Sequence, residues 1–351
     1  MNKKINLVIK TALQKRQRFY YHQRHKLEAE SLLKNIESEK GKIDERFKRM
    51  SKEYAHDVLG WTGFAPWLNV YTAIAGEFKE GWIPDNYYGE IVISKLKGLY
   101  RSFSKANSLS SKILNTDQIP DIVYYVNGLF FSISLQVLPV EIIKKYLFDN
   151  NFRIIYKVDA SQQGKGIHVF TKETFDIKKI FSLGNGVFKK YIDQHDFFEE
   201  IMPNSVATLR LTSVIENNGK ASCRAAYLKI GRCEDTHVKS SSAIKVSVDL
   251  LSGMLQEKGY LPNFCSVKCH PDTHFIFEGK VLPKFNECVA YILKTHHEIP
   301  FCRSIGWDLT VNKDEQIQLI EWNGNHNGIK FSEATQGPCF ADLGWENLWK
   351  E

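Results

Sequence analysis

The sequence has no long hydrophobic run and no regular cysteine pattern. None of its apolar stretches reaches the roughly 18 residues that a membrane span requires, and residues 1–10 are too polar for a secretory leader. The seven cysteines are scattered and odd in number, which is typical of reduced thiols. Cys265 and Cys269 lack the second pair that a structural zinc site would need. We therefore expect a cytoplasmic protein without a transmembrane segment.

The signature motifs of several enzyme classes are also absent. The sequence contains no G-x-S-x-G, no H-E-x-x-H, no G-x-G-x-x-G behind a predicted strand and no G-x-x-x-x-G-K-[ST]. These absences argue against a serine hydrolase, a zinc protease, a Rossmann nucleotide site and a P-loop. Any catalytic site must therefore be sought in less common patterns of charged residues and glycine.

Positive charge is concentrated near the N-terminus. The formal net charge is +7, but residues 1–50 carry 14 Lys/Arg and 6 Asp/Glu, a net +8, whereas the remainder carries 33 and 34, a net −1. A nucleic-acid enzyme would carry its charge in a groove of the body, so we expect no nucleic acid partner. The basic arm would suit peripheral contact with an anionic membrane surface, a protein partner or a polyanionic glycan, and a solvated helix face explains it equally well.

Apolar and turn-forming residues are distributed as in an α+β protein. A hydrophobic content of 43% and a charged content of 25% are ordinary for a globular chain, and the length allows two or three domains. Residues 5–50 predict one or two long helices with a break near Gly41, and the aromatic-rich residues 50–100 predict a packed core. Strands are predicted at 119–131, 153–158, 166–171, 186–192, 207–214, 221–230 and 244–248, and helices at 139–149 and 286–299. Because strands and helices do not alternate regularly, we expect a mostly antiparallel sheet.

Two acidic residues and one amide are predicted to share a face of a C-terminal hairpin. Residues 304–310 and 317–323 read as strands, and a turn centred between residues 313 and 314 would place Asp308 opposite Leu319. Glu321 then lies diagonally from Asp308 on the same face, and Asn323 follows it by the two-residue period. Oxygen-only ligands of this kind suit Mg²⁺, although a solvated hairpin face would carry the same residues.

A glycine-containing loop follows a strand that ends close to a lysine. Lys157 stands near the end of the strand at 153–158, and the loop contains Ser161, Gln162, Gly164, Lys165 and Gly166. Backbone N–H groups can approach phosphate oxygens where glycine allows unusual φ angles, and lysine supplies a point charge. Many hairpins carry Gly and Lys for other reasons, so phosphate binding and an ordinary hairpin both stay open.

Three cationic residues lie on or beside predicted strands. Arg210 sits inside an apolar strand, where an unpaired charge is costly, so it needs either a structural carboxylate or a substrate phosphate. Lys229 and Arg232 repeat the pattern at the end of the strand at 221–230. His270 and Asp272 occupy a polar loop, where they would either contact substrate or only satisfy the loop itself.

Taken in chain order, these motifs resemble the ATP-grasp superfamily, and within it the sugar-transfer-associated ATP-grasp family, relatives of α-L-glutamate-ligase-type proteins. The resemblance runs from about residue 51 to about residue 327 and is most specific at Gly306-Trp307-Asp308 and Glu321-Trp322-Asn323. It implies an α+β ATP-grasp fold, in which two α+β subdomains sandwich ATP behind a helical N-terminal region. The implied parts are a basic helical arm (1–50), an aromatic-rich N-terminal domain (51–118), a lid subdomain with the glycine flap (119–187) and a catalytic subdomain with the magnesium site (188–351).

The resemblance also implies roles for individual residues. Asp308, Glu321 and Asn323 would hold Mg²⁺, and the catalytic cations that offset charge on the transferred phosphoryl group would be Arg210, Lys229 and Arg232. His270 and Asp272 would contact the substrate. ATP would be bound by Lys105, Lys157, Ser161, Gln162, Gly164, Lys165, Gly166, Lys190, Tyr191 and Ile192.

The implied chemistry is ATP-dependent ligation of a carboxylate and an amine through an acyl-phosphate, on a sugar acid or amino acid in the assembly of a bacterial surface polysaccharide. The partners would be a small-molecule carboxylate and an amine, with a sugar nucleotide or glycan as a further candidate. Two alternatives stay open: a kinase of a small-molecule or sugar hydroxyl, and a non-catalytic nucleotide-binding partner of a glycosyltransferase. Ala207, where family members often carry Asn, and Ser240–Ala243, where a glycine pair is common, depart from the family pattern.

Overall fold

The computed structural model describes residues 2–161, 166–232, 235, 237–239 and 241–350, with side chains from residue 10 onward. The chain divides into two compact units. Unit 1 comprises residues 1–95, 263–265 and 328–351, and unit 2 comprises residues 96–262 and 266–327. Unit 1 is helical, whereas unit 2 holds both β-sheets. The four-part division at residues 50, 118 and 187 stays a prediction.

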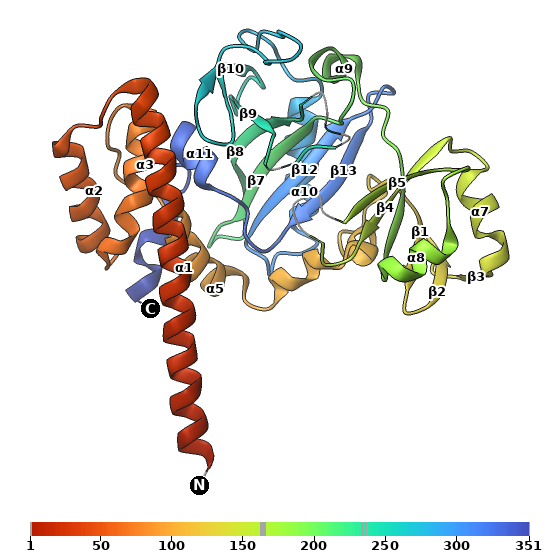
Figure 1. Ribbon diagram of the computed structural model, residues 1–351, viewed down its shortest axis with the longest axis horizontal. Helices are drawn as coiled ribbons and strands as arrows, with labels where there is room; N and C mark the ends of the chain where they lie inside the picture. The colour runs from red at the N-terminus through yellow and green to blue at the C-terminus, as the bar shows by residue number, and fades with distance from the viewer. Residues whose placement is uncertain (1, 162–165, 233–234, 236, 240, 351) are drawn as a thin grey trace. The chain divides into compact units, whose positions relative to one another are not determined.

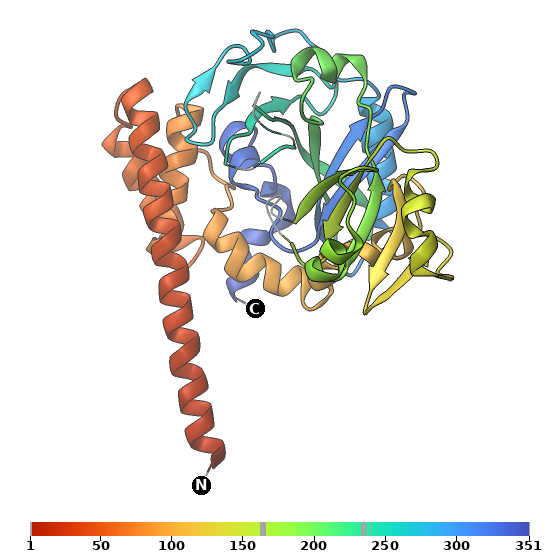
Figure 2. The same cartoon turned by 45° about the vertical axis from the view of Figure 1, so that its right-hand side comes forward.

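Unit 1 is built on one long helix, drawn in red in Figures 1 and 2. The helices α1 (Asn2–Lys40), α2 (Glu45–Asp57) and α3 (Ala65–Ala75) pack side by side. The predicted break near Gly41 is confirmed, because Gly41 has φ +87° and Asp44 caps α2 by accepting the N–H of Arg46 at 2.7 Å. The shorter elements are η1 (Thr62–Phe64), α4 (Asp85–Tyr87), η2 (Tyr88–Val92), α11 (Lys330–Thr335), η5 (Ala341–Leu343) and η6 (Trp345–Lys350).

The aromatic-rich stretch forms the interior of unit 1, as the sequence predicts. Five of its rings are fully buried: Trp67, Tyr71, Trp82, Tyr87 and Tyr88. The rings of Tyr71 and Trp82 meet edge to face with their centroids 5.8 Å apart, and the Trp82 indole N–H donates to the carbonyl oxygen of Glu333 at 2.8 Å. Among the described residues, no helix has both the length and the apolar composition needed to cross a bilayer.

The first sheet of unit 2 has six strands in the order β3-β2-β1-β6-β4-β5. These are β1 (Asp121–Val126), β2 (Leu129–Ser132), β3 (Val137–Leu138), β4 (Arg153–Val158), β5 (Ile167–Thr171) and β6 (Gly186–Lys190). One face packs on α7 (Val140–Phe148) and α8 (Ile177–Leu183) through a buried apolar cluster. The chain reaches this sheet through α5 (Ile93–Lys97), η3 (Tyr100–Lys105), η4 (Asn107–Leu109) and α6 (Ser110–Ile113).

The second sheet of unit 2 has seven strands in the order β11-β10-β9-β8-β7-β12-β13. These are β7 (Thr208–Ile215), β8 (Ala221–Ile230), β9 (Ile244–Val248), β10 (Leu255–Tyr260), β11 (Ser266–Val267), β12 (Ser304–Val311) and β13 (Ile317–Asn323). Figures 1 and 2 show β7, β12 and β13 side by side, and α10 (Phe285–His296) packs on β7 and β8. The remaining helix is α9 (Asp196–Ile201).

The strand pairings described in both sheets are antiparallel. The predicted α+β class with a helical N-terminal region is therefore confirmed. The predicted bounds of β4, β8 and β9 match the structure residue for residue. The strand β10 was not predicted, because Leu255-Gln256-Glu257-Lys258-Gly259 lacks apolar alternation. Its extended conformation is set by its pairing with β9 and β11.

The buried His296 predicts an acid-sensitive core under the second sheet. Its Nδ1 lies 2.7 Å from the Ser213 hydroxyl, which also accepts the Trp307 indole N–H at 2.7 Å, and its Nε2 lies 2.9 Å from the carbonyl oxygen of Cys302. The neutral ring satisfies this pattern by donating from Nε2 and accepting at Nδ1. Burial lowers the pKa of His296 to about 4.

Because the unfolded chain binds this proton more readily, the stability from His296 is full above pH 6.5 and falls as the pH drops toward 4. We expect a loss on the order of 3 kcal/mol in the free energy of unfolding between these limits. Urea unfolding at several pH values measures it. His296→Gln does not titrate and should show a shallower decline over the same range. An equal decline in both proteins would contradict this assignment.

Candidate functional site

The predicted acidic hairpin forms, but with a different register. Asp308 in β12 pairs with Glu321 in β13 and not with Leu319, which pairs with Leu309. The ladder shifts between these two pairs, so that Ile320 is the extra residue of a β-bulge. The sequence-based register was therefore wrong. The bulge brings the two carboxylate-bearing positions directly opposite each other, closer than the predicted diagonal.

Asp308 is the centre of a buried ion-pair group on the second sheet. It lies opposite Arg210 of β7, whose Nε and Nη2 each donate to its carboxylate at 2.7 Å. The Lys229 ammonium of β8 lies 2.9 Å from Asp308 Oδ1. Gly306 leaves room for this pair, because a Cβ there would lie 3.2 Å from Arg210 Nη1. Arg210 therefore has a structural carboxylate as its anionic partner, one of the two alternatives that its position in an apolar strand left open.

The proton states in this group follow from burial and from the neighbouring charges. Burial raises the pKa of Asp308, but Arg210 and Lys229 outweigh it and hold that pKa well below its usual range. Burial lowers the pKa of the Lys229 ammonium, and Asp308 opposes the shift. The carboxylate is therefore ionised throughout the physiological pH range.

Glu321 connects this group to the first sheet. The Lys157 ammonium of β4 donates to Glu321 Oε2, and the Asn323 amide nitrogen lies 3.3 Å from Glu321 Oε1 and 3.4 Å from Asp308 Oδ2. Lys157 is buried, whereas the Glu321 side chain is 35% exposed. Charged side chains from two separate sheets therefore meet at one point of unit 2.

A further ion pair beside Lys157 was not found from the sequence. Lys189 of β6 is buried, and its ammonium donates to Asp121 Oδ1 of β1 at 2.7 Å. Burial lowers the pKa of Lys189, and Asp121 opposes the shift. Sequence alone could not have found this pair, because the pairing of Lys157 with Val187, which puts Lys189 two residues further along the same face, is set by the sheet.

A buried lysine that was not predicted from the sequence also supports Arg210. The Lys97 ammonium donates to the carbonyl oxygen of Asn325 at 2.6 Å and to Asn327 Oδ1 at 2.9 Å. The carbonyl oxygen of Asn327 accepts from Arg210 Nη1 at 2.7 Å. Burial lowers the pKa of Lys97 to about 7. Lys97 thus fixes the chain segment after β13 that holds one edge of the Arg210 guanidinium.

The start of the glycine loop is anchored by η4, and its other described residues bond to β4. Asp159 accepts from the Ser108 N–H at 3.0 Å and from the Ser108 hydroxyl at 2.7 Å. The Ser161 hydroxyl donates to the carbonyl oxygen of Val158 at 2.7 Å, and the Val158 N–H donates to that of Gly166 at 2.9 Å. Three predicted ATP-binding residues, Gln162, Gly164 and Lys165, lie outside the described residues.

Lys105 reaches this loop through its backbone. Its carbonyl oxygen accepts the N–H of Ala160 at 2.7 Å, and its side chain is exposed. The structure therefore brings the backbone of Lys105 to the base of the loop, and ATP binding by Lys105 stays a prediction. The Lys105 ammonium is not part of the buried ion-pair group around Asp308.

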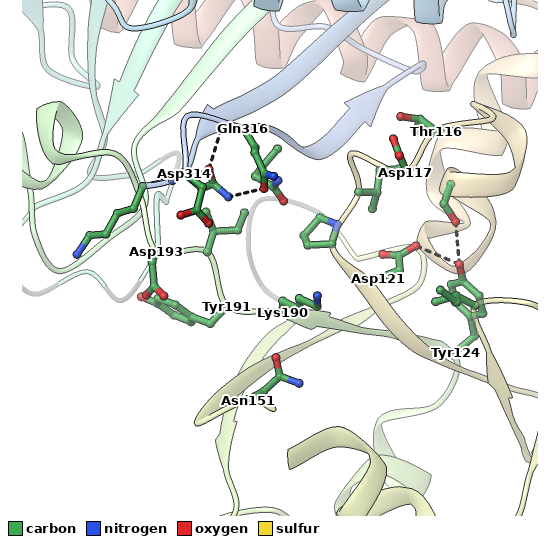
Figure 3. A pocket seen from close by; sticks show the side chains of 18 of the residues that line it. Thr116, Asp117, Asp121, Tyr124, Asn151, Lys190, Tyr191, Asp193, Asp314 and Gln316 are labelled. Carbon is green, nitrogen blue, oxygen red and sulfur yellow. Dashed lines mark hydrogen bonds between the residues drawn. The ribbon is translucent and has the colours of Figure 1, made fainter. Parts of the chain in front are cut away.

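Three of the predicted ATP-binding residues line a large cleft of unit 2, with a volume of roughly 1180 Å³. Lys190, Tyr191 and Ile192 lie along it, and in the view of Figure 3 Lys190 lies between Tyr191 and Asp121. The Arg153 guanidinium stacks on the Tyr191 ring, 3.4 Å from its centroid. A volume of this size exceeds that of a typical drug-sized ligand site.

The cleft lies beside the ion-pair group around Asp308 but does not include it. None of the charged residues Lys157, Arg210, Asp308 and Glu321 is among the described lining residues of the cleft. Asp121 belongs to both, because it lines the cleft and pairs with Lys189. The shared Asp121–Lys189 pair is where a ligand lying in the cleft would extend toward the charged group.

Arg232, Asp272 and His270 form a separate arrangement. The Arg232 guanidinium donates to Asp272 through Nε at 2.7 Å and Nη2 at 2.6 Å. His270 is buried, with Nε2 3.0 Å from the carbonyl oxygen of Gly231 and Nδ1 3.3 Å from the N–H groups of Asp272 and Thr273. Burial lowers the pKa of His270. Both ring nitrogens are thus engaged by the backbone, which fixes the loop beside the Arg232–Asp272 pair.

The hairpin residues fit a hard divalent cation. Asp308 and Glu321 present carboxylate oxygens on one face, and the Asn323 amide lies within 3.4 Å of both. An amide oxygen takes the place of its nitrogen when the side chain is flipped, which would complete an oxygen-only donor set. No group of three His, Cys, Asp or Glu side chains suited to a metal occurs in the described part of the chain. Two protein carboxylates with substrate oxygens are what Mg²⁺ usually takes.

The charges of the group favour an anionic ligand. Four cations, Lys157, Lys189, Arg210 and Lys229, surround three carboxylates, those of Asp121, Asp308 and Glu321. The excess of one positive charge, in partly buried surroundings, attracts an anion more strongly than an exposed surface would. With a divalent cation at the hairpin the excess becomes larger, so the arrangement can hold a polyphosphate.

The sequence was also compared with known families and proteins. Residues 179–342 match the model of a family described as sugar-transfer associated ATP-grasp. A comparison with curated proteins found none that matches.

Three solved structures illustrate the structural comparison. The chain is similar to a biotin carboxylase from Campylobacter jejuni at 14% identity and a TM-score of 0.44, covering 69% of this chain and 46% of that one. It is similar to an N5-carboxyaminoimidazole synthetase from Staphylococcus aureus complexed with ADP at 14% and 0.42, covering 71% and 54%. It is similar to a D-alanyl-alanine synthetase A from Vibrio cholerae at 15% and 0.44, covering 76% and 73%. The chain spans about half the length of the first two.

Proposed function

We propose that the protein is an ATP-dependent carboxylate–amine ligase of the sugar-transfer associated ATP-grasp family, whose model residues 179–342 match. The reaction would pass through an acyl-phosphate. Its carboxylate would belong to a sugar acid or an amino acid, and its product would enter the assembly of a bacterial surface polysaccharide. ATP supply would place the reaction in the cytoplasm.

One observation carries this proposal: Lys157 of the first sheet meets Glu321 of the second sheet, beside Asp308, Arg210 and Lys229. An enzyme that transfers a phosphoryl group needs little covalent catalysis. It acts mainly by positioning the reactants and by placing charged groups around the transferred phosphoryl group. A charged group assembled from two sheets, next to a cleft of nucleotide size, meets that requirement. No side-chain nucleophile is needed.

In the first step, a carboxylate oxygen of the substrate forms a bond to the γ-phosphorus of ATP while the bond to the bridging oxygen breaks, giving an acyl-phosphate and ADP. Arg210 uses three of its five N–H donors on Asp308 and Asn327, which leaves two for the transferred phosphoryl group. The Lys157 ammonium donates one hydrogen bond to Glu321 and has two N–H donors left for phosphate oxygens. Both cations would offset negative charge as it builds.

Asp308, Glu321 and Asn323 would hold Mg²⁺, which neutralises phosphate charge when it is bound. Their positions on paired strands fix the donor atoms before the nucleotide arrives. Lys190, Tyr191 and Ile192 would contact the adenine end of the nucleotide in the cleft. Asp159 and Ser108 would anchor the loop from residue 159 to residue 166, whose proposed task is to keep water from the acyl-phosphate.

In the second step, the amine nitrogen forms a bond to the acyl carbon, phosphate leaves with the bonding electron pair, and the nitrogen loses a proton to give the amide. The chain would favour the amine over water by excluding solvent from the acyl-phosphate. Arg232 and Asp272 are candidates for contact with the acceptor, because their side chains remain partly accessible, 37% and 18% exposed. His270 would position them through the backbone contacts it makes.

An ADP-release assay tests the proposal. Uronic acids and amino acids are offered in combination with amines, together with ATP and Mg²⁺. We expect ADP to form only when both a carboxylic acid and an amine are present, and the product mass to equal the sum of the two substrates less one water. A stable phosphorylated alcohol formed without any amine would contradict the ligase and support a kinase.

A further inference from the structure

The first half of α1 is exposed along its length. Every described side chain from residue 10 to residue 20 is exposed, and Figures 1 and 2 show this half of the helix extending past α2 and α3. The proposed ligase chemistry uses no residue of this half. The buried residues that pack the helix on unit 1 lie in its second half: His22, His25, Ala29, Leu32 and Ile36.

Large apolar side chains lie on the helix surface away from these buried residues. Leu13, Tyr20 and Leu27 follow one another at intervals of seven residues, and Phe19 adjoins Tyr20. All four, which we call the apolar stripe, are between 53% and 62% exposed. Tyr20 and Leu27 each stand two residues from a buried histidine, and two residues correspond to about 200° of rotation in an α-helix. Contact with unit 1 therefore leaves the stripe open.

The sequence continues the stripe toward the N-terminus. At about 100° per residue, the Ile, Val and Ile at positions 5, 8 and 9 fall in the same helix sector, about 140° wide, as Ala12 and the apolar stripe. Between residues 5 and 20 the charged residue of this sector is Arg16, whose guanidinium lies over the Tyr20 ring, 5.5 Å from its centroid. An arginine can keep its apolar stem in such a sector while its charged end reaches out of it.

The rest of this helix surface is basic. Residues 1–27 contain eight Lys or Arg and no Asp or Glu, so the net charge of +8 in residues 1–50 arises entirely there. Arg18 pairs with Glu90, and Lys26 lies 3.7 Å from Glu30. A helix with many Lys and Arg on one face and Phe, Leu and Tyr on the other has the composition of helices that lie in the plane of a membrane surface.

The pattern argues against a second copy of the chain as the partner of the apolar stripe. A two-stranded coiled coil needs two apolar positions in each heptad, and residues 13, 20 and 27 supply only one of them. The positions that would supply the other, 16 or 17 and 23 or 24, hold Arg, Gln, Gln and Arg. Pairing two copies would also bring eight cations of each chain together without an acidic residue between them.

A soluble polyanion would use only half of this surface. It would neutralise the lysines and arginines but leave the apolar stripe in water. A membrane surface that contains anionic lipids offers both parts at once, negative charge in the headgroup layer and apolar chains directly beneath it. The two properties of the helix therefore favour the lipid surface.

From these observations we propose that the first half of α1, with Leu27, binds the surface of a membrane that contains anionic lipids. The apolar stripe lies at the boundary of headgroups and acyl chains, the cations lie among the headgroups, and Arg16 extends its guanidinium toward lipid phosphates. This inference does not depend on the ligase reaction proposed for unit 2. It gives the positive charge of residues 1–27 a definite partner.

The test is co-sedimentation of the full chain with lipid vesicles. We expect the partition coefficient to be at least about tenfold larger on phosphatidylcholine vesicles with about 30% phosphatidylglycerol than on phosphatidylcholine alone. Salt at about 0.5 M should lower it, because the attraction between exposed charges is screened.

An apolar variant tests the stripe without changing any charge. Leu13→Gln/Phe19→Gln/Tyr20→Gln places a helix-favouring residue at three exposed positions, so the chain should stay folded and bind anionic vesicles about tenfold more weakly. The melting temperature checks the fold. The matched control removes three apolar side chains of unit 2 that are at least 84% exposed and should bind as the wild type does: Leu99→Gln/Phe152→Gln/Leu251→Gln.

A second pair of variants tests the charge. Lys10→Gln/Lys15→Gln/Arg16→Gln should bind anionic vesicles about tenfold more weakly. Its control removes three exposed cations of unit 1 from outside residues 1–27 and should lose much less: Lys34→Gln/Lys42→Gln/Arg46→Gln.

Four results would overturn the proposal. The first is equal partition onto neutral and anionic vesicles, and the second is an equal loss in a variant and its control. The third is oligouridylate binding as tight as vesicle binding and unchanged in the apolar variant, which would assign the helix to a nucleic acid. The fourth is a dimer, seen by sedimentation without lipid, that the apolar variant converts to a monomer.

Discussion

Replacing Asp308 by Asn is expected to lower the free energy of unfolding by about 3–5 kcal/mol, because the change leaves two buried cations without their counter-charge. Asp308 is 2% exposed, and Arg210 and Lys229 both direct their N–H donors at its carboxylate. Asn keeps the shape of the side chain but not its charge, and it turns one acceptor into a donor that faces Arg210 or Lys229. The loss comes from electrostatics and hydrogen bonding, not from a cavity.

Urea unfolding at neutral pH measures this change. Asp314→Asn is the matched control, since Asp314 is an exposed acid at the turn of the same hairpin and its removal should alter stability by less than about 0.5 kcal/mol. A second variant that replaces Asp308, Arg210 and Lys229 together by apolar residues of similar size should recover much of the loss, because buried ion pairs often exchange for apolar packing without cost. A small loss for Asp308→Asn alone would mean that the three charges are not coupled in solution.

Glu321→Gln is expected to lower ATP-dependent ADP release by about 10²–10³-fold while the chain stays folded. Glu321 contributes a carboxylate to the proposed magnesium site and accepts from Lys157, so the amide removes a charge that the nucleotide complex requires. Its side chain is 35% exposed, so water partly screens the loss of its charge. The effect on stability should therefore be much smaller than that of Asp308→Asn.

Steady-state ADP release with the substrates found in the screen measures this prediction, together with the melting temperature. Glu315→Gln, at the exposed turn of the same hairpin, removes an equal charge and should keep near wild-type activity. A rise in the Mg²⁺ concentration needed for half-maximal rate would locate the defect at the metal. Wild-type turnover by Glu321→Gln would remove this residue from the catalytic group and with it the principal support for the ligase.

Local patterns predicted most of the elements that surround the site. The strands at 153–158 and 221–230 have enough β-branched and apolar residues to be recognised without their partners, and both match the structure in their bounds. The requirement that Arg210 have an anionic partner also followed from sequence, because a charge inside an apolar strand has few other solutions. The identity of the partner, Asp308 of β12, came only from the pairing of β7 with β12.

Two adjacent lysines of β6 show the limit of such reasoning. Lys189 and Lys190 are adjacent and chemically alike, and the sequence favoured Lys190 as the ligand-binding residue. In the structure Lys190 lines the cleft, while Lys189 is buried against Asp121 next to Lys157. Which of two neighbouring side chains points to which face is fixed by pairing across the whole sheet, and a sequence window of a few residues does not contain it.

The sequence by itself determined the chemistry that is available: two carboxylates and an amide on one hairpin, a lysine before a glycine loop, and an arginine in need of an anion. These follow from side-chain type and from the two-residue period of a strand, both of which are local. Only the tertiary structure decided the register, through a bulge at Ile320, and the meeting of Lys157 with Glu321, which are 164 residues apart. Contacts between distant strands depend on the packing energy of the complete core, so they are not encoded in any short stretch of the chain.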